Sequence, residues 1–285
     1  MKKWVIMYLS NLTERSIKMV DGYYVIDSHC HIYPEKIASR AVAGTDNFYG
    51  TVSFGNGITD QLRELKDISG TDLYIVQSVA TTAKQVGSIN EFIANEVDKG
   101  DGLFVGLGTL YPDSDNIKED VRHLVSLGLK GVKLHPDIQN FKIDDYRCLK
   151  IYELCEQEGL PILMHTGDNR YDNSNPNRLV PILNIFSGLT VIGAHLGGYS
   201  IWDEASEKLA GLDNLYVDCS SSFPFIDKQT ALDIIRKYGA DKVLYGTDYP
   251  MWSPIEEIRT FMSLGLTDDE KRNILSENAK RLFLK

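Results

Sequence analysis

The sequence PILMHTGD, residues 161–168, joins a short apolar run to a histidine and then to polar residues. An apolar run of this length, without polar alternation, is typical of a parallel strand that is buried on both faces. The stretches VIGAHLGG (191–198) and VLYGTDYP (243–250) follow the same plan. The repeat therefore predicts parallel strands whose carboxyl ends carry polar side chains.

Eight such apolar runs alternate with longer amphipathic stretches along the 285 residues. This order predicts an α/β fold, a closed (β/α)8 TIM barrel that forms one domain over residues 20–285. An open doubly wound sheet is the alternative, but no glycine-rich phosphate loop follows any run. The predicted strands are residues 24–27, 72–79, 103–110, 131–135, 161–165, 190–195, 215–219 and 242–247. The predicted helices include residues 117–126, 145–157, 206–211, 231–238, 255–264 and 268–284.

Two segments fall outside this repeat. Residues 1–19 contain an apolar stretch that is too short to span a membrane and lacks a signal-peptide cleavage site. We expect a poorly ordered N-terminal extension there. Residues 40–57 hold four glycines and three aromatic side chains, which predicts a long loop that acts as a lid over the barrel mouth.

Composition and charge exclude several classes of protein. The 43% hydrophobic and 25% charged residues are typical of a globular protein and exclude a disordered one. The 30 Lys and Arg against 40 Asp and Glu give a net charge of −10, which disfavours nucleic acid and anionic membranes as partners. The four cysteines form no CxxC pair and favour a reduced, cytoplasmic location. We therefore expect a small-molecule substrate.

Five of the six histidines lie at the carboxyl ends of predicted strands, where TIM barrels carry their chemistry. His29 and His31 should share one face of a strand, because strand side chains alternate. His165 and His195 end the fifth and sixth strands, and Asp248 follows the eighth. Three inward histidines and one aspartate suit a single divalent metal ion, with zinc as the default and manganese, cobalt, nickel or iron as alternatives.

The motifs DSHCH (27–31), VKLHP (132–136), HTGD (165–168), AHLGG (194–198) and GTDYP (246–250) resemble, in this order, those of the amidohydrolase superfamily. They are most similar to the amidohydrolase 2 branch, which is related to aminocarboxymuconate-semialdehyde decarboxylase, and the resemblance covers residue 25 to the C-terminus. It implies a metal-bearing TIM barrel with His29, His31, His165 and Asp248 as ligands. It also implies a catalytic His195 and a homodimer.

The fourth predicted strand leaves alternatives open. Lys133 and His135 lie on one face of it. In binuclear members of the superfamily a carboxylated lysine at this place bridges two ions, so Lys133 is a candidate for a second metal site with His165 and His195. Lys133 is equally a candidate to bind a substrate carboxylate or to pair with an acid such as Asp218. His135 is a candidate to line the pocket.

These residues suit a metal-dependent hydrolase that acts on an amide, lactone or ester. A metal ion lowers the pKa of water to about 7, Asp248 moves the proton, and His195 stabilises the developing oxyanion. Non-oxidative decarboxylation of an unsaturated or aromatic acid needs nearly the same groups and is the alternative. A metal-binding or interaction module without catalytic activity and a metal-free lactonase are further alternatives. The candidate substrate-binding residues are Tyr49, Arg170, Tyr249 and Trp252.

Overall fold

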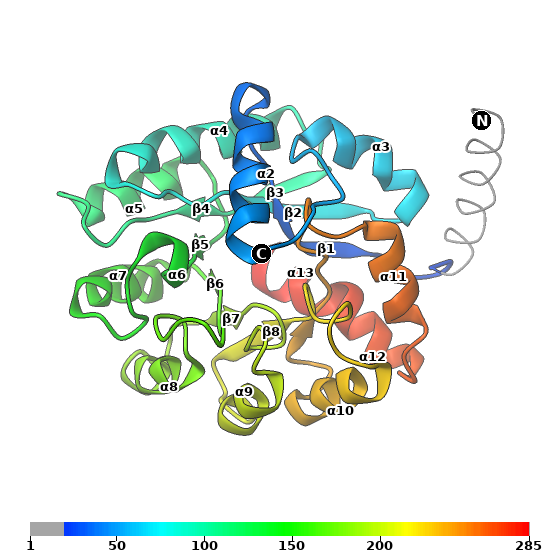
Figure 1. The fold of residues 1–285 in the computed structure, drawn as a ribbon. Helices are drawn as coiled ribbons and strands as arrows, with labels where there is room; N and C mark the ends of the chain where they lie inside the picture. Colours follow the sequence, from blue (N-terminus) through cyan, green and yellow to red (C-terminus); the bar gives the residue numbers. More distant parts are fainter. Residues whose placement is uncertain (1–19, 285) are drawn as a thin grey trace.

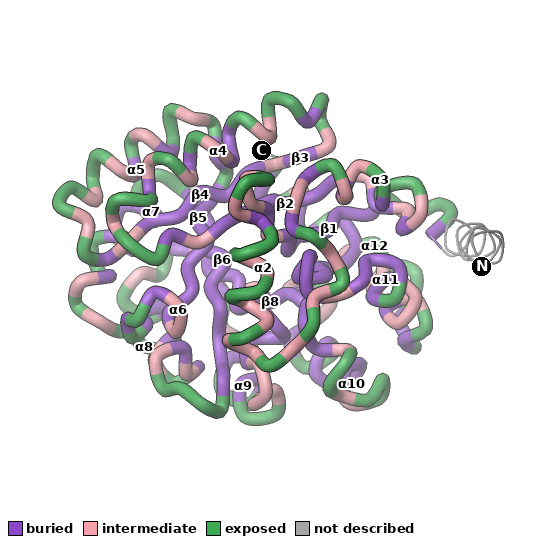
Figure 2. The backbone as a smooth tube through the Cα atoms, turned by 45° about the horizontal axis from the view of Figure 1, so that its top comes forward, coloured by how far each residue is buried: buried purple, intermediate pink, exposed green. Residues whose placement is uncertain are grey.

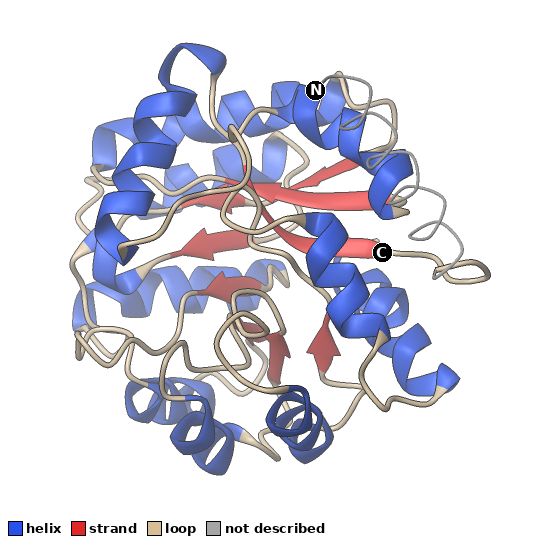
Figure 3. Cartoon of the chain, turned by 45° about the vertical axis from the view of Figure 1, so that its right-hand side comes forward, coloured by secondary structure: helices blue, strands red, loops and turns tan. Residues whose placement is uncertain are grey.

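Parallel strands form a ring, and the helices lie outside it (Figure 1, Figure 3). The structure, a computed structural model, describes residues 20–284, and the extension expected at 1–19 lies outside the described residues. The strands are β1 (Ile26–His31), β2 (Leu73–Gln77), β3 (Phe104–Gly106), β4 (Gly108–Thr109), β5 (Val132–Leu134), β6 (Ile162–Met164), β7 (Val191–Gly193), β8 (Leu215–Asp218) and β9 (Val243–Leu244). β1 begins later than predicted and continues to the end of the DSHCH motif.

The strands pair in two groups, β1–β2–β3 and β4–β9. Further hydrogen bonds join the two groups into a ring. β3 and β4 are one predicted strand interrupted at Leu107, whose amide still donates to Val76 O of β2 at 2.9 Å. On the opposite side, the Ser28 amide of β1 donates to Tyr245 O, next to β9, at 2.9 Å. The predicted TIM barrel is therefore confirmed.

An inner apolar cluster fills the barrel, and a larger outer cluster joins the strands to the helices. Full burial of one such aliphatic side chain contributes about 1.5–3 kcal/mol. The inner cluster includes Ile26, Leu73, Ile75, Leu107, Leu163, Ile192 and Leu244. This cluster closes the barrel below, so a ligand can enter only at the mouth.

A bulge in β1 decides which of its side chains enter the barrel. Asp27 and Cys30 are three residues apart, but they pair with residues of β2 that are only two apart. The extra residue shifts the alternation: Ile26 belongs to the inner cluster, whereas Cys30 belongs to the outer one. His29 and His31 therefore lie on the inner face, above the apolar layer.

The main helices surround the strands. They are α2 (Glu35–Tyr49), α3 (Thr59–Ser69), α4 (Val86–Asp98), α5 (Ile117–Ser126), α6 (Pro136–Gln139), α7 (Leu149–Glu158), α8 (Pro176–Ile185), α9 (Trp202–Leu209), α10 (Lys228–Tyr238), α11 (Pro254–Met262), α12 (Asp268–Arg272) and α13 (Asn278–Phe283). The helix predicted at 268–284 is interrupted by a π-helical turn, Asn273–Glu277. Within residues 20–284, no helix has the length and apolar character needed to cross a bilayer.

Helix α2 takes the place of most of the loop predicted at 40–57. The expectation of a loop was wrong for residues 40–49, because the alanines there favour a helix and the internal Gly44 costs only about 1 kcal/mol. The helix ends where Gly50 adopts a left-handed φ of 67°. α2 lies across the barrel mouth, in front of the strands (Figure 2).

Candidate metal centre

Three side chains meet at the carboxyl end of the barrel: His29 and His31 from β1, and Asp248 from the turn after β9. The Nε2 atoms of His29 and His31 lie 3.2 Å apart. The Asp248 Oδ1 atom lies 3.3 Å from Nε2 of His29 and 3.5 Å from Nε2 of His31. The structure thus brings three of the four predicted ligands together, and we call them the metal triad.

The spacing within the metal triad matches the coordination sphere of a small divalent ion. Ligand atoms about 2.0–2.1 Å from a tetrahedral centre lie about 3.4 Å from one another. The three observed separations range from 3.2 to 3.5 Å. Two imidazole nitrogens and a carboxylate oxygen are donors that zinc and its first-row neighbours accept. The residues present therefore fit a divalent metal ion.

A carboxylate behind His29 fixes the direction of its ring. Asp218 ends β8 and is fully buried, and its Oδ2 atom lies 3.0 Å from His29 Nδ1. Its Oδ1 atom accepts from the amides of Ser220 at 3.0 Å and His195 at 3.2 Å. Because an ionised carboxylate only accepts, Nδ1 carries the proton and Nε2 presents its lone pair to the metal triad. Gly246 leaves space here, since an added Cβ would lie 2.9 Å from that of His29.

His165 and His195 form a second pair of imidazoles beside the metal triad. His195 Nε2 lies 3.0 Å from His165 Nδ1, and the His195 ring stacks on that of His29 with centroids 5.3 Å apart. His195 Nδ1 faces the Ser220 carbonyl at 3.1 Å, so Nδ1 donates and Nε2 is left as an acceptor. His165, the fourth predicted ligand, contacts His195 and is not part of the compact three-residue group.

Hydrogen bonds hold the outer oxygen of Asp248. The Ser221 hydroxyl donates to Asp248 Oδ2 at 2.6 Å, and Trp252 Nε1 donates to that hydroxyl at 2.8 Å. Oδ1 is thereby directed to the metal triad. Asp248 and His195 both have left-handed backbones, with φ of 59° and 61°. This conformation costs a non-glycine residue of order 1–3 kcal/mol and is concentrated at active sites.

Lys133 brings a buried cation to the same place. It lies on β5 with 1% of its surface exposed, and its Nζ atom is 3.0 Å from His29 Nε2. Burial lowers the pKa of Lys133 to about 8, although Asp248 and Asp218 oppose the shift. The ammonium form therefore prevails at pH 7, directly beside the metal triad.

Burial keeps the imidazoles of His31, His165 and His195 neutral. It lowers the pKa of His195 to about 4, and it lowers the pKa values of His31 and His165 well below their usual range. Neutral imidazole is the form that binds a metal ion. Burial acts to raise the pKa of Asp248, but the site histidines and a serine hydroxyl outweigh it, so the pKa lies below its usual value. Within the metal triad, His31 thus presents a neutral nitrogen and Asp248 an anionic oxygen.

His135 and Asp137 lie on the far side of His165. The His135 ring stacks on the His165 ring with centroids 4.0 Å apart, and its Nε2 atom lies 2.7 Å from the Tyr49 hydroxyl. Asp137 Oδ2 lies 3.7 Å from His165 Nε2 and accepts from the Ser174 hydroxyl at 2.5 Å. His135 therefore lines the cavity and packs against the His165 ring.

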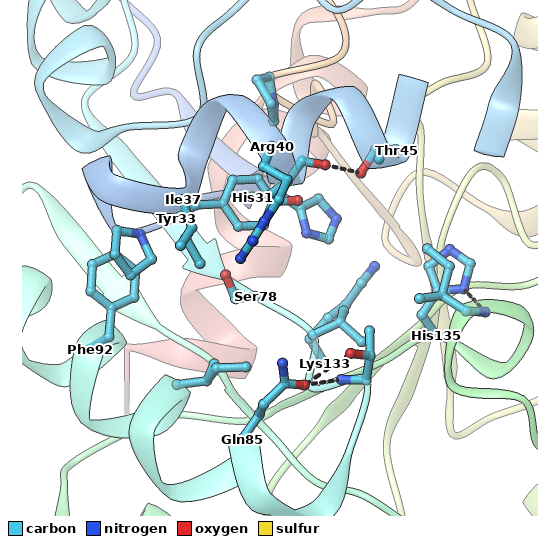
Figure 4. Close-up of a pocket in the computed structure, with 18 of the residues that line it drawn as sticks. His31, Tyr33, Ile37, Arg40, Thr45, Ser78, Gln85, Phe92, Lys133 and His135 are labelled. Carbon is cyan, nitrogen blue, oxygen red and sulfur yellow. Dashed lines mark hydrogen bonds between the residues drawn. The ribbon is translucent and has the colours of Figure 1, made fainter. Parts of the chain in front are cut away.

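A cavity of about 880 Å³ opens above the metal triad (Figure 4). Tyr49 lines it, but the other predicted substrate-binding residues are not among its lining residues. Arg170 instead pairs with Asp168 at 2.7 Å and donates to the Phe48 carbonyl at 2.6 Å, at the end of α2. The Tyr249 hydroxyl donates to Ile58 O at 3.1 Å, in the segment before α3, and Trp252 acts through Ser221.

Sequence reasoning missed how Asp218, Ser220 and Ser221 contribute. From the sequence, Asp218 is only a candidate partner for Lys133, and the serines suggest only a turn or hydrogen-bond suppliers. The available signal was strand alternation: Asp218 and Ser220 lie two residues apart at the carboxyl end of a strand, so both face inward. Their hydrogen bonds to His29 and His195 fix the ring orientations at the site.

Comparisons with known proteins agree with this geometry. A curated relative, 2-amino-3-carboxymuconate-6-semialdehyde decarboxylase of Dictyostelium discoideum, is 22% identical over 237 residues, which cover 67% of this chain and 64% of that protein's length. A dihydroxybenzoic acid decarboxylase from Polaromonas, solved with manganese and an inhibitor, is 18% identical over 92% of this chain and 97% of its own, with a TM-score of 0.71. A structure from Pseudomonas putida, proposed to be a 2-pyrone-4,6-dicarboxylic acid hydrolase, is 18% identical over 91% and 97% of the two chains, with a TM-score of 0.65.

The family assignment rests on nearly the whole described chain. The sequence profile of the amidohydrolase family matches residues 26–284, from β1 to the end of the last helix. The chain therefore belongs to the amidohydrolase family, in its amidohydrolase 2 branch.

Proposed function

We propose that this protein is a metal-dependent decarboxylase that removes CO2 from a small unsaturated or aromatic carboxylic acid without net oxidation. The observation that carries the proposal is the metal triad at the floor of a cavity, with the buried ammonium of Lys133 3.0 Å from His29 Nε2. The activities of the Dictyostelium relative and the Polaromonas structure support it. Hydrolysis of an amide, lactone or ester, which the sequence favoured, is the second candidate, supported by the Pseudomonas structure.

The donor set determines which ion we propose. His29, His31 and Asp248 would hold one divalent ion, and His165 remains the proposed fourth ligand. Zinc is the default for such donors, and manganese, which the Polaromonas structure holds, is the alternative. When bound, the ion would supply Lewis acidity that polarises a substrate oxygen.

The residues of the chain supply binding and proton transfer. The Lys133 ammonium pairs with the substrate carboxylate, which the buried site strips of water. The bond between the carboxyl carbon and its neighbour breaks, CO2 leaves, and the electron pair stays on that neighbouring carbon, which takes one proton. The proton comes from solvent, and we assign the ionised carboxylate of Asp248, whose Oδ2 is held by Ser221, to relay it to that carbon. His195 Nε2, an acceptor that faces His165 Nδ1 at 3.0 Å, would hold a substrate hydroxyl only by exchanging this partner for it.

The remaining expectations are also proposals. We propose a cytoplasmic enzyme that acts on a small molecule, without nucleic acid or a membrane as partner. We propose that it forms a homodimer.

The test uses the metal-loaded protein with a panel of aromatic and unsaturated acids in D2O. The proposal expects metal-dependent CO2 release and one deuterium at the carbon that lost the carboxyl group. Asp248→Asn should lose at least about 100-fold in turnover, the lower end of the usual acid–base contribution. Turnover of lactones, esters or amides without CO2 release from any acid would replace the proposal with hydrolysis.

A further inference from the structure

The cavity extends well beyond the metal triad, into a space between α2 and α4. We call this space the α2–α4 arm, lined on α2 by residues from Lys36 to Phe48 and on α4 by residues from Ser88 to Lys99. At 1.5 Å per residue, these faces are about 18 Å and about 16 Å long. The whole cavity, about 880 Å³, is near the upper end of the usual range for drug-sized ligands, about 300–1,000 Å³. A single-ring acid would leave most of it unfilled.

The face of α2 toward this arm is not packed against another helix. Among its 15 residues, α2 buries only Ala38. Its lining positions, 36, 37, 40, 41, 44, 45 and 48, recur every three to four residues and form one continuous helix face. Gly44 lies in the middle of this face, and a Cβ added there would meet nothing within 4 Å. The face therefore borders open space around Gly44, whereas at its C-terminal end the Phe48 ring stacks on that of Tyr171 with centroids 5.4 Å apart.

The walls of the arm are apolar between the two helices. Ile37 and Ala41 face it from α2, and Ile89 and Phe92 face it from α4. In Figure 4, Ile37 and Arg40 extend from α2 into the cavity, and Phe92 lies at the end away from His135. Such walls favour a ring or another apolar body over a hydrated chain.

The charge along the arm is net positive, with Lys36, Arg40 and Lys99 against Glu91 and Glu96. Within residues 20–284, neither Lys36 nor Arg40 makes an ion pair, although both line the arm. On α4, by contrast, Glu96 is already bound by Lys99 at 2.9 Å and by the Thr59 hydroxyl at 2.6 Å. A guanidinium without a partner, next to apolar walls, is suited to a carboxylate or phosphate group.

We propose that the α2–α4 arm binds the non-reacting end of an elongated substrate, which has an apolar body and a terminal anionic group that pairs with Arg40. This inference rests on the proposed function, because the reacting carboxyl group has to lie at the metal triad. It narrows the substrate class from single-ring acids to longer molecules with two polar ends.

Three unreactive probes measure the parts of the arm separately: benzoate, biphenyl-4-carboxylate and biphenyl-4,4′-dicarboxylate. Their dissociation constants are measured by calorimetry with the metal-loaded and the metal-free protein. The inference expects biphenyl-4-carboxylate to bind at least tenfold more tightly than benzoate. It expects biphenyl-4,4′-dicarboxylate to bind at least threefold more tightly than biphenyl-4-carboxylate. A 4′-phosphonate probe shows which anion is preferred, and a gain with either anion supports the inference.

Two variants with matched controls locate these gains. Gly44→Leu fills the arm and should abolish the gain from the second ring, whereas benzoate affinity should stay unchanged. Gly87→Leu is its control, because Gly87 also borders open space but does not line the cavity. Arg40→Met should abolish only the gain from the second anion, and Arg122→Met, an exposed arginine on α5, should not.

The outcomes separate this inference from the proposed function. No gain from the second ring in the wild type, or an undiminished gain in Gly44→Leu, overturns the α2–α4 arm as a binding site. An unchanged anion gain in Arg40→Met overturns the role of Arg40. Failure of the proposed function would give a different result. Benzoate affinity would then not depend on the metal, while the second ring and the second anion would still tighten binding.

Discussion

Replacing Asp218 by asparagine should weaken metal binding without removing any ligand. Asp218 Oδ1 accepts two backbone amides, from Ser220 and His195, so the carbonyl oxygen of the substituted side chain must stay on that side. The side-chain amide nitrogen then faces His29 Nδ1, which lies 3.0 Å from the present Oδ2. Because this amide donates, Nδ1 becomes the acceptor and the proton moves to Nε2, the atom that faces the metal triad.

Loss of such a partner typically costs 10–100-fold in metal affinity, which is about 1.4–2.7 kcal/mol. The assay titrates the metal-free protein with zinc against a chromophoric chelator at pH 7. Circular dichroism of the metal-free variant checks the fold, and Asp213→Asn, an exposed acid before β8, is the matched control. An Asp218→Asn protein that is folded and binds zinc as tightly as the wild type would refute this reasoning.

Three further predictions concern the site and its surroundings. Asp248→Asn, with metal content measured in the same sample, should lower kcat at least about 100-fold, and unchanged turnover would remove Asp248 from the mechanism. Arg170→Met removes the hydrogen bond to the Phe48 carbonyl at the end of α2. It should raise KM a few-fold with less effect on kcat, because the contact is partly exposed. An unaltered KM would show that α2 does not depend on this contact. Burial raises the pKa of Glu257 to about 8, so the native state keeps a proton that the unfolded chain releases near pH 4.5. Glu257 by itself should therefore lower stability by roughly 3 kcal/mol between pH 5 and pH 8; in urea unfolding, the stability of the wild type relative to Glu257→Gln should fall by this amount over that range, and an unchanged difference would contradict the assignment.

The sequence predicted the barrel because its strands are short, apolar on both faces and regularly spaced. The boundaries of runs such as 161–165 and 190–195 lie within one or two residues of those of the observed β6 and β7. The first strand was placed too early, because the polar DSHCH motif, which forms all of β1 except Ile26, does not look like a strand. Its bulge could not be predicted, since register depends on pairing with β2.

The convergence of His29, His31 and Asp248 could be predicted, because each lies at the carboxyl end of a strand and these ends meet at the barrel mouth. The side chains that surround and hold the metal triad could not be predicted in the same way. Arg170 appeared to be a free cation in a polar run, but its partners, Asp168 and the end of α2, depend on the path of the loop. The glycine within α2 made this segment look like a loop. The α2–α4 arm could not be predicted either, because a cavity depends on how separate elements pack together.

Anomalous diffraction from crystals of the metal-loaded protein, recorded at the absorption edge of the metal, tests the central claim most directly. The account predicts one strong peak per chain, about 2.0–2.2 Å from His29 Nε2, His31 Nε2 and Asp248 Oδ1. A peak held by His135, Asp137 and His165 instead, or no peak at the metal triad, would contradict it.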